Sequence, residues 1–124
     1  MLYAILCYHD EAVVGSWSKE EDDAVLAKRD VVTQKLAAQG RLGPVARLMP
    51  TTAATTVRSG RESLVIDGPF AETKEQLLGF YVLDCADDDA AVEAARELQR
   101  VNPGAVYEIR PVRRYIPGAA LPEA

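Results

Sequence analysis

The sequence has little of the chemistry that metal centres and disulfide scaffolds require. Among 124 residues there is one histidine, and the two cysteines are not part of a Cys-x-x-Cys pair. One histidine without clustered carboxylates leaves too few ligands for a metal site, so we expect no metal and no cofactor. Cys7 and Cys85 each lie in a strand-like run, which predicts buried, inert thiols in a reducing compartment. Pairing of the first strand with the strand over 79–86 would allow the two thiols to be neighbours, but a disulfide is not expected in the cytosol.

Several other signals are missing. The apolar runs are far too short to span a bilayer, and the first residues lack the charged start and cleavage site of a signal peptide. Fourteen basic residues against nineteen acidic ones give a net charge of −5, and the arginines are scattered. This pattern argues against nucleic acid and membrane as partners. Neither a glycine-rich phosphate loop nor a Ser-His-Asp arrangement is present. A cytoplasmic location is the expectation.

The composition that remains, 48% apolar and 27% charged, is typical of one globular domain. Hydrophobic periodicity and turn residues predict this order of elements: a strand over 1–8, a loop over 9–17, a helix from 18 to 40, an edge strand over 41–50, a hairpin over 51–67, a strand over 77–86, a helix from 87 to 102 and a strand over 105–115. The order is a split βαβ pattern with an added strand, which predicts a ferredoxin-like α+β sandwich. Residues 117–124 are expected to form a loose tail.

Both predicted helices have clear start signals. Ser18 and Glu21 have the spacing of a capping box, and Gly40 is a suitable residue to follow the helix end. Asp87 to Asp89 suit the first turn of the second helix. The expected buried faces are Val25, Leu26, Val32, Leu36 and Ala37 in the first helix, and Ala91, Val92, Ala95 and Leu98 in the second.

The central strands are apolar on both faces. In the first strand, Leu2, Ala4 and Leu6 alternate with Tyr3 and Ile5, although two helices can cover only one face of a sheet. A large uncovered apolar sheet is rare on a soluble monomer. The sequence therefore predicts a homodimer in which the two sheets pack against each other.

One stretch, residues 65–75, reads VIDGPFAETKE and holds the first candidate site. A strand ends at Asp67, turns through Gly68 and Pro69, and returns with Phe70. An aspartate before Gly-Pro is a common turn former, because its carboxylate can accept turn amides. Alternatively, the turn holds Asp67 in a cleft as a general acid or base. Phe70 is a candidate for ligand contact, or a plug in the core or an interface.

The remaining candidates lie on or beside strands. Histidine is the side chain type that by default titrates near neutral pH, and His9 follows the first strand, where it is either an exposed loop residue or an acid–base group. Arg110 shares a strand face with Glu108 and is either at a sheet edge or the anchor of a carboxylate or phenolate ligand. Tyr81, Arg47 and Arg58 are weaker candidates for ligand binding.

TTVRSGRESLVIDGPFAETKEQLLGFYVLD, together with MLYAILCYHDE and YEIRPV, resembles the DGPF branch of the YCII-related family over residues 1–116. The resemblance implies a single domain that forms a dimeric α+β barrel. It also implies a small-molecule lyase or isomerase acting on an aromatic or carboxylated ligand. The alternative is a non-catalytic accessory protein that binds a ligand or an extracytoplasmic-function sigma factor. Family members carry a histidine in the first helix, thought to pair with an aspartate. AVLAKRDVVTQKL, the corresponding stretch here, has none.

Overall fold

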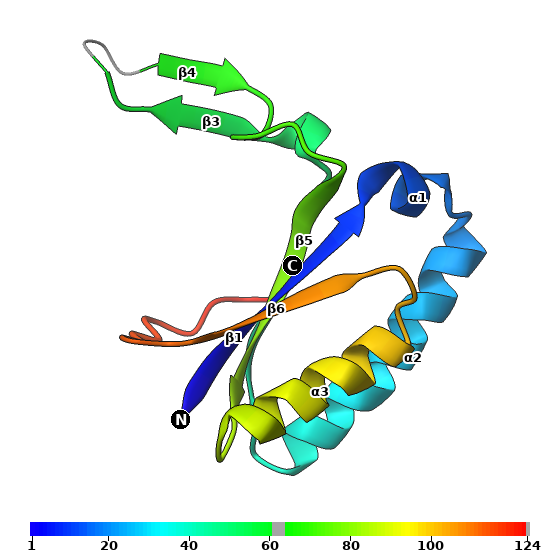
Figure 1. Cartoon of the computed structure of the whole chain (residues 1–124), viewed down its shortest axis with the longest axis vertical. Coiled ribbons are helices and arrows are strands. Elements are labelled where there is room, and N and C mark those ends of the chain that lie inside the picture. The colour runs from blue at the N-terminus through cyan, green and yellow to red at the C-terminus, as the bar shows by residue number, and fades with distance from the viewer. Residues whose placement is uncertain (61–63, 124) are drawn as a thin grey trace.

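A computed structural model of the chain describes residues 1–60 and 64–123. Its main sheet is antiparallel, with the strand order β2-β5-β1-β6 (Figure 1). The strands are β1 (Leu2–Asp10), β2 (Leu42–Arg47), β5 (Glu75–Asp84) and β6 (Val106–Pro111). This arrangement confirms the predicted ferredoxin-like α+β class, and it confirms β2 as an edge strand.

Helices cover one face of this sheet (Figure 1). α2 (Lys19–Ala38) and α3 (Asp88–Arg100) lie side by side on it, and a short helix, α1 (Glu11–Ser16), joins β1 to α2. The largest fully buried side chains between helices and sheet include Tyr3, Ile5, Leu83 and Leu98. Burial of such apolar side chains is the main stabilising contribution to the fold.

The start of α2 is the predicted capping box. Ser18 Oγ accepts a hydrogen bond from the Glu21 amide at 3.1 Å, and the Ser18 amide donates to Glu21 Oε1 at 3.2 Å. After the helix, Gly40 adopts a φ of 70°, a conformation that glycine takes without strain. Local sequence therefore fixes both ends of α2.

Two predicted element details are wrong. β1 continues to Asp10, and α1 occupies most of the stretch predicted as a loop, because the Asp10 carboxylate caps the Ala12 amide at 2.9 Å. The predicted buried faces are also wrong in part: Ala37 of α2 is exposed, and in α3 Val92 is 38% exposed while Ala94 is buried. The buried stripe of α3 runs through residues 91, 94, 95 and 98, which is the i, i+3, i+4, i+7 spacing of one helix face.

The cysteines are both free and buried, as predicted. They are not neighbours, although β1 does pair with β5. The pairing is antiparallel and places Cys7 opposite Gly79, whereas the Cys85 amide donates to the Met1 carbonyl at the other end of β1. The expectation that they could be adjacent is therefore wrong.

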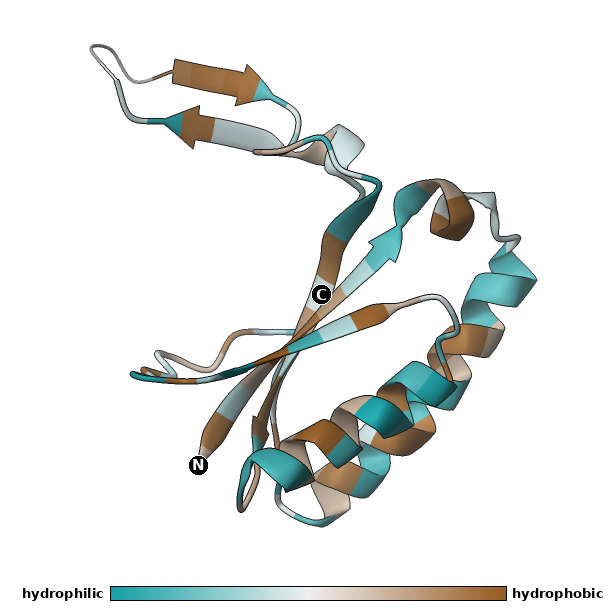
Figure 2. Ribbon diagram, in the orientation of Figure 1, coloured by the Kyte–Doolittle hydropathy of each residue, from teal (hydrophilic) through white to brown (hydrophobic). Residues whose placement is uncertain are grey.

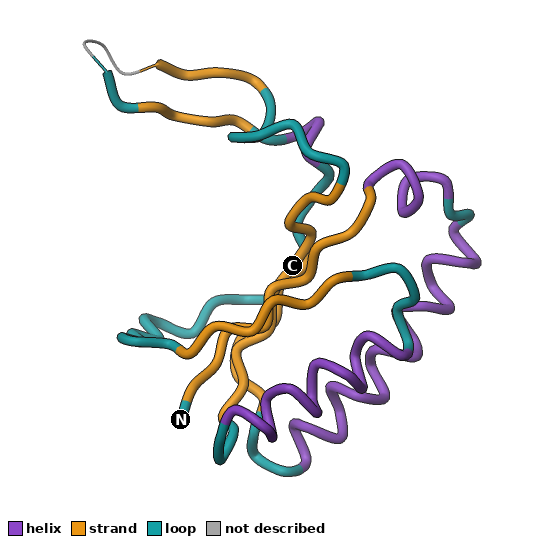
Figure 3. The backbone as a smooth tube through the Cα atoms, in the orientation of Figure 1, coloured by secondary structure: helices purple, strands orange, loops and turns teal. Residues whose placement is uncertain are grey.

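A second, two-stranded sheet projects from the body as an arm (Figure 3). It consists of β3 (Thr55–Arg58) and β4 (Leu64–Asp67), and a 3₁₀ turn, η1 (Thr51–Ala53), precedes it. The two strands confirm a hairpin between 51 and 67, but its predicted connection at Ser59-Gly60-Arg61 lies partly outside the described residues. Both strands contain apolar residues, coloured brown in Figure 2, and the side chains of Val57, Leu64, Val65 and Ile66 are exposed.

The sheet face opposite the helices carries the other apolar set. Leu2, Ala4 and Leu6 point to this side, together with Phe80 and Val82 of β5, and all five remain partly exposed in the single chain. Helices lie only on the opposite side of this sheet in the described residues (Figure 1). The homodimer stays a prediction.

Among the described residues, no helix is both long enough and apolar enough for a membrane crossing. Residues 112–123 form no helix or strand.

Candidate functional site

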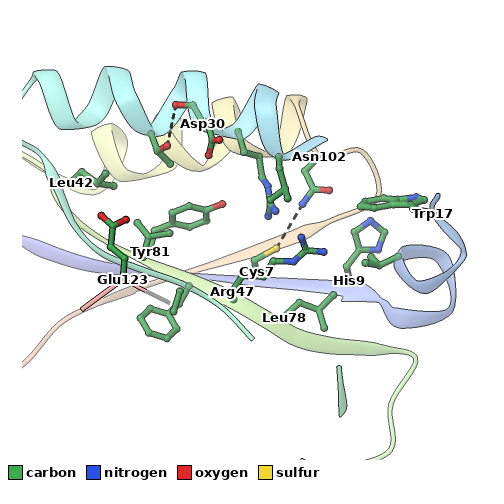
Figure 4. Close-up of a pocket in the computed structure, with 18 residues that line it drawn as sticks. Cys7, His9, Trp17, Asp30, Leu42, Arg47, Leu78, Tyr81, Asn102 and Glu123 are labelled. Carbon is green, nitrogen blue, oxygen red and sulfur yellow. Dashed lines mark hydrogen bonds between the residues drawn. The ribbon is translucent and has the colours of Figure 1, made fainter. Parts of the chain in front are cut away.

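A pocket of about 460 Å³ lies between α2 and the helix-covered face of the sheet (Figure 4). Its volume falls within the range of about 300 to 1,000 Å³ that is usual for small-molecule sites. The polar lining includes His9, Arg29, Arg47, Tyr81 and Asn102. Apolar walls come mainly from Val14, Trp17, Leu26, Val45 and Leu78.

His9 is part of β1 and is only 3% exposed. The expectation of an exposed loop histidine is therefore wrong, because the strand extends two residues further than the sequence pattern indicates. Its ring lies edge-on to Trp17, with ring centroids 5.6 Å apart. Nε2 is 3.2 Å from the Pro103 carbonyl oxygen, and Nδ1 is buried without a hydrogen-bond partner in the described part of the chain.

Two further polar atoms of the pocket residues are buried and unpaired within residues 1–60 and 64–123. They are Nε of Arg29 and Oδ1 of Asn102. Asn102 Nδ2, in contrast, donates to the Tyr107 hydroxyl at 3.1 Å. Buried polar atoms are nearly always hydrogen-bonded in folded proteins, so three unpaired ones around one pocket are unusual. They indicate a place where a ligand or water completes the hydrogen bonding.

The two arginines of the pocket differ in their partners. Arg47 binds Asp22 through two hydrogen bonds of 2.7 and 3.1 Å, and this contact holds the pKa of the Asp22 carboxyl below its usual value. Among the described residues, Arg29 forms no salt bridge within 4.0 Å, although its charge also helps to lower the pKa of Asp22. Arg29 is therefore less committed to a carboxylate than Arg47, which is hydrogen-bonded to one.

The neutral donors of the pocket are held protonated at neutral pH. Burial raises the pKa of the Tyr81 hydroxyl, and the nearby Arg29 guanidinium opposes this effect. Burial likewise raises the pKa of Tyr107, whose ring packs 6.4 Å from that of Tyr81. Burial also raises the pKa of the Cys7 thiol. These groups can donate hydrogen bonds, and the thiol is poorly suited to act as a nucleophile.

The close-up shows how the pocket is arranged (Figure 4). His9 and Trp17 form one end. Cys7 and Arg47 lie in the middle, and the Tyr81 hydroxyl points inward from the other side. Two carboxylates, Asp30 of α2 and Glu123 of the tail, also line the pocket.

The remaining sequence candidates lie elsewhere. Arg110 pairs with Ala4 on the sheet face without helices, and it is exposed. Asp67 is exposed on the arm opposite Thr55, and its carboxylate makes no hydrogen bond within the described residues. Phe70 is 74% exposed beneath the Arg58 guanidinium, which lies 5.0 Å from the ring centroid. The structure thus brings His9 and Tyr81 together, but not Asp67, Phe70 or Arg110 with them.

The turn after β4 does not use the Asp67 side chain. The Gly68 amide donates to the Ala54 carbonyl at 2.8 Å, and Thr56 Oγ1 donates to the Gly68 carbonyl at the same distance. Gly68 has a φ of 110°, which side-chain-bearing residues rarely adopt. Backbone contacts and the glycine make this turn, so the role of Asp67 stays a prediction.

Sequence reasoning missed Arg29 and Asn102. Arg29 lies three residues after Leu26 and three before Val32, so it occupies the apolar face of α2. An arginine on the buried face of an amphipathic helix was the available signal. Asn102 was assigned only to the end of α3, and its local sequence gave no indication that it is 3% exposed and lines the pocket.

The described residues contain no cluster suited to a metal ion. Within the part of the chain that the structure describes, no three histidine, cysteine, aspartate or glutamate side chains come together where they could hold an ion.

Comparison with known proteins identifies the family of the chain. The YCII-related domain family matches residues 1–116. The chain belongs to this family. An uncharacterised protein of Rhizobium meliloti (strain 1021) is 58% identical over 120 residues, which cover 95% of this chain and 97% of the relative. This YCII-related protein is therefore similar to the relative over nearly its whole length, and the relative's description states no activity.

Proposed function

We propose that the pocket beneath α2 binds a small organic anion, and that His9 performs acid–base chemistry on it. The observation that carries this proposal is the set of three buried, unpaired polar atoms, which all belong to residues around one pocket. A structural core residue normally has its polar atoms satisfied. A bound ligand with suitable donors and acceptors would form hydrogen bonds with these three atoms.

Charge and lining favour a carboxylate on an aromatic or otherwise apolar frame. A guanidinium forms paired, charge-assisted hydrogen bonds with a carboxylate, and Arg29 has no carboxylate partner among the described residues. Trp17, Leu26 and Val45 supply apolar surface for the rest of the molecule. The ligand class is therefore the one that the family resemblance implies.

Acid–base chemistry is supported by the position of His9. It is the only histidine in the sequence, and it is buried at the pocket with one ring nitrogen that has no partner within residues 1–60 and 64–123. A histidine can accept and return a proton near neutral pH. The protonated Tyr81 hydroxyl is a donor for oxygen charge that develops on the ligand. These groups suit an isomerase or lyase, and Asp67 has no part in the proposal.

Binding is tested by calorimetric titration with phenylacetate, a small aromatic carboxylate. We expect Arg29→Gln to weaken binding at least tenfold, because it removes the charge that the carboxylate needs. Lys28→Gln, an exposed change one residue earlier in α2, is the matched control and should leave the affinity unchanged. Equal affinities for the parent and Arg29→Gln would contradict the proposed site.

Catalysis is tested separately with phenylpyruvate in D₂O. Proton NMR should show that the protein accelerates deuterium exchange at the methylene carbon, and that His9→Gln removes the acceleration. Glutamine can still donate to the Pro103 carbonyl but cannot take up a proton at neutral pH. Binding without exchange would favour the alternative of a non-catalytic ligand-binding module. Association with a sigma factor stays a prediction.

We also propose that a second copy covers the open face of the sheet. Support comes from the five partly exposed apolar side chains there, from the family resemblance, and from Glu108 and Arg110. These opposite charges share that face, so two symmetry-related copies could pair them. Mass measurement in dilute neutral solution is the test. A dimer is expected, and a stable, well-folded monomer would contradict it.

A further inference from the structure

The hydrogen bond of His9 determines which ring nitrogen carries the proton. Nε2 lies 3.2 Å from the Pro103 carbonyl oxygen, which can only accept a hydrogen bond. Nε2 is therefore the protonated nitrogen, and in the neutral ring Nδ1 is a bare acceptor. Nδ1 is the buried atom without a partner among the described residues.

The turn after α3 is shaped to make this contact. Gly104 has a φ of 87°, and a Cβ placed on it would lie 3.1 Å from Cε1 of His9 and 3.3 Å from Nε2. Such a Cβ would crowd the ring while also straining the backbone. The absence of a side chain at position 104 lets the Pro103 carbonyl reach the imidazole.

We infer that Pro103 and Gly104 hold His9, which lines the pocket, in the tautomer with a bare Nδ1, and that the ligand of this pocket bears a hydrogen-bond donor or acidic proton for that nitrogen beside its anionic group. The Asn102 Oδ1 atom supplies a second unpaired acceptor, and Arg29 supplies the charged donor. A hydroxy acid or an enol acid has this combination of groups. The tautomer is inferred only from the contacts of His9 with Pro103 and Gly104, whereas the ligand class rests on the proposed function.

The same geometry defines a balanced proton transfer. The ligand's O–H or activated C–H bond breaks, its proton moves to Nδ1, and the bonding electron pair stays on the ligand as an alkoxide or enolate. Arg29 then faces the new negative charge, while the Nε2 proton keeps its bond to the Pro103 carbonyl. Return of the proton to another ligand atom completes an isomerisation and restores the neutral ring without a co-reactant.

The tautomer can be measured directly, because the chain has a single histidine. Untagged protein labelled with ¹⁵N-histidine gives one pair of ring nitrogens in a long-range ¹H–¹⁵N spectrum. At a pH where the ring is neutral, we expect a protonated Nε2 and an unprotonated Nδ1. A proton found mainly on Nδ1 would overturn the inference.

Two alanine variants test the positioning role of Gly104. Gly104→Ala is expected to give a mixture of both tautomers, since the added Cβ displaces the ring from the carbonyl. Gly40→Ala is the matched control, because Gly40 also has a positive φ, 70°, but nothing lies within 4 Å of an added Cβ. It should leave the spectrum unchanged. An unchanged tautomer in Gly104→Ala would contradict the positioning role.

The ligand class is tested with mandelate and phenylacetate, which differ by one α-hydroxyl donor. Mandelate is expected to bind about tenfold more tightly, the ratio that one net hydrogen bond supplies. His9→Leu, which has no acceptor, should abolish the preference. Equal binding of the two acids to the parent would overturn the inferred ligand class. If neither acid binds, the proposed function fails and the ligand class with it, while the spectrum alone still decides the tautomer.

Discussion

The pocket beneath α2 and the arm formed by β3 and β4 both carry residues suited to acid–base or ligand chemistry, but they place them in opposite environments. In the pocket, His9 is 3% exposed and keeps an unpaired ring nitrogen. On the arm, Asp67 is exposed and Phe70 is 74% exposed. Solvent reaches the Asp67 carboxylate, whereas Nδ1 of His9 is buried and has no hydrogen-bond partner among the described residues.

The difference shows that a recognisable motif and a built site can lie in different parts of one chain. The DGPF stretch is prominent because its glycine and proline form a turn with unusual backbone angles. The pocket residues come from β1, α1, α2, β2, β5, the turn after α3 and the tail, and no short sequence motif contains them. Burial of unpaired polar atoms favours the pocket over the arm.

The largest expected effect separates the two regions by stability. His9→Ala removes a buried ring and its hydrogen bond, and we expect a loss of about 3 kcal/mol. Asp67→Asn should change stability by no more than about 0.5 kcal/mol, because the exposed carboxylate has no hydrogen bond in the described residues. Urea unfolding of both variants is the measurement. Similar losses of unfolding free energy in His9→Ala and Asp67→Asn would contradict the difference between a buried pocket residue and an exposed arm residue.

A smaller effect is expected at the start of α2, which forms one side of the pocket. Ser18→Ala removes the observed cap and should cost about 1 kcal/mol, with phenylacetate affinity unchanged. Ser59→Ala, on the arm, is the comparison and should stay within about 0.5 kcal/mol. Thermal unfolding with calorimetric titration measures both properties. An unaffected melting temperature for Ser18→Ala would show that the cap does not stabilise the helix.

Arg29 is expected to lower stability slightly in the unliganded protein. Arg29→Met keeps an unbranched side chain but removes a buried, unpaired Nε, so stability should stay equal or rise by up to about 1 kcal/mol. Lys28→Met provides the exposed control. A loss above 2 kcal/mol in chemical unfolding of Arg29→Met would mean that the arginine serves the core rather than a ligand.

The last effect is recognised by its pH dependence and concerns the contact between β1 and α3. Tyr3 Oη donates to Asp88 Oδ1 at 2.6 Å, and this contact with the carboxylate raises the pKa of Tyr3 to about 12. Because the folded pKa lies above the ordinary value of about 10, its contribution is full below pH 10 and is lost as pH rises toward 12. Tyr3→Phe should reduce the fall in stability over that window. Identical alkaline unfolding curves would contradict this linkage.

Much of the fold could be predicted because it is encoded locally. Nearly continuous apolar runs mark β1 and β5, and Ser18 with Glu21 marks the start of α2. The buried stripe of α3 was misplaced at Val92, since propensity does not indicate which way a short helix turns toward its neighbour. Tertiary packing decides that orientation.

The site was harder to predict for a physical reason. His9 was assigned to a loop because strand ends depend on pairing with partner strands, and pairing continues here to Asp10. The contact between His9 and Pro103 joins residues 94 positions apart, so neither local sequence contains it. Tyr81 and Arg47 were named as candidates, but their shared pocket depends on how α2 packs across the sheet.

The most direct test of the central claim is a crystal structure with bound phenylacetate. The account predicts ligand density between α2 and the sheet, with the carboxylate within hydrogen-bonding distance of Arg29 and the aromatic ring against Trp17 or Leu26. Density beside Asp67 on the arm, with the pocket beneath α2 holding only water, would contradict it.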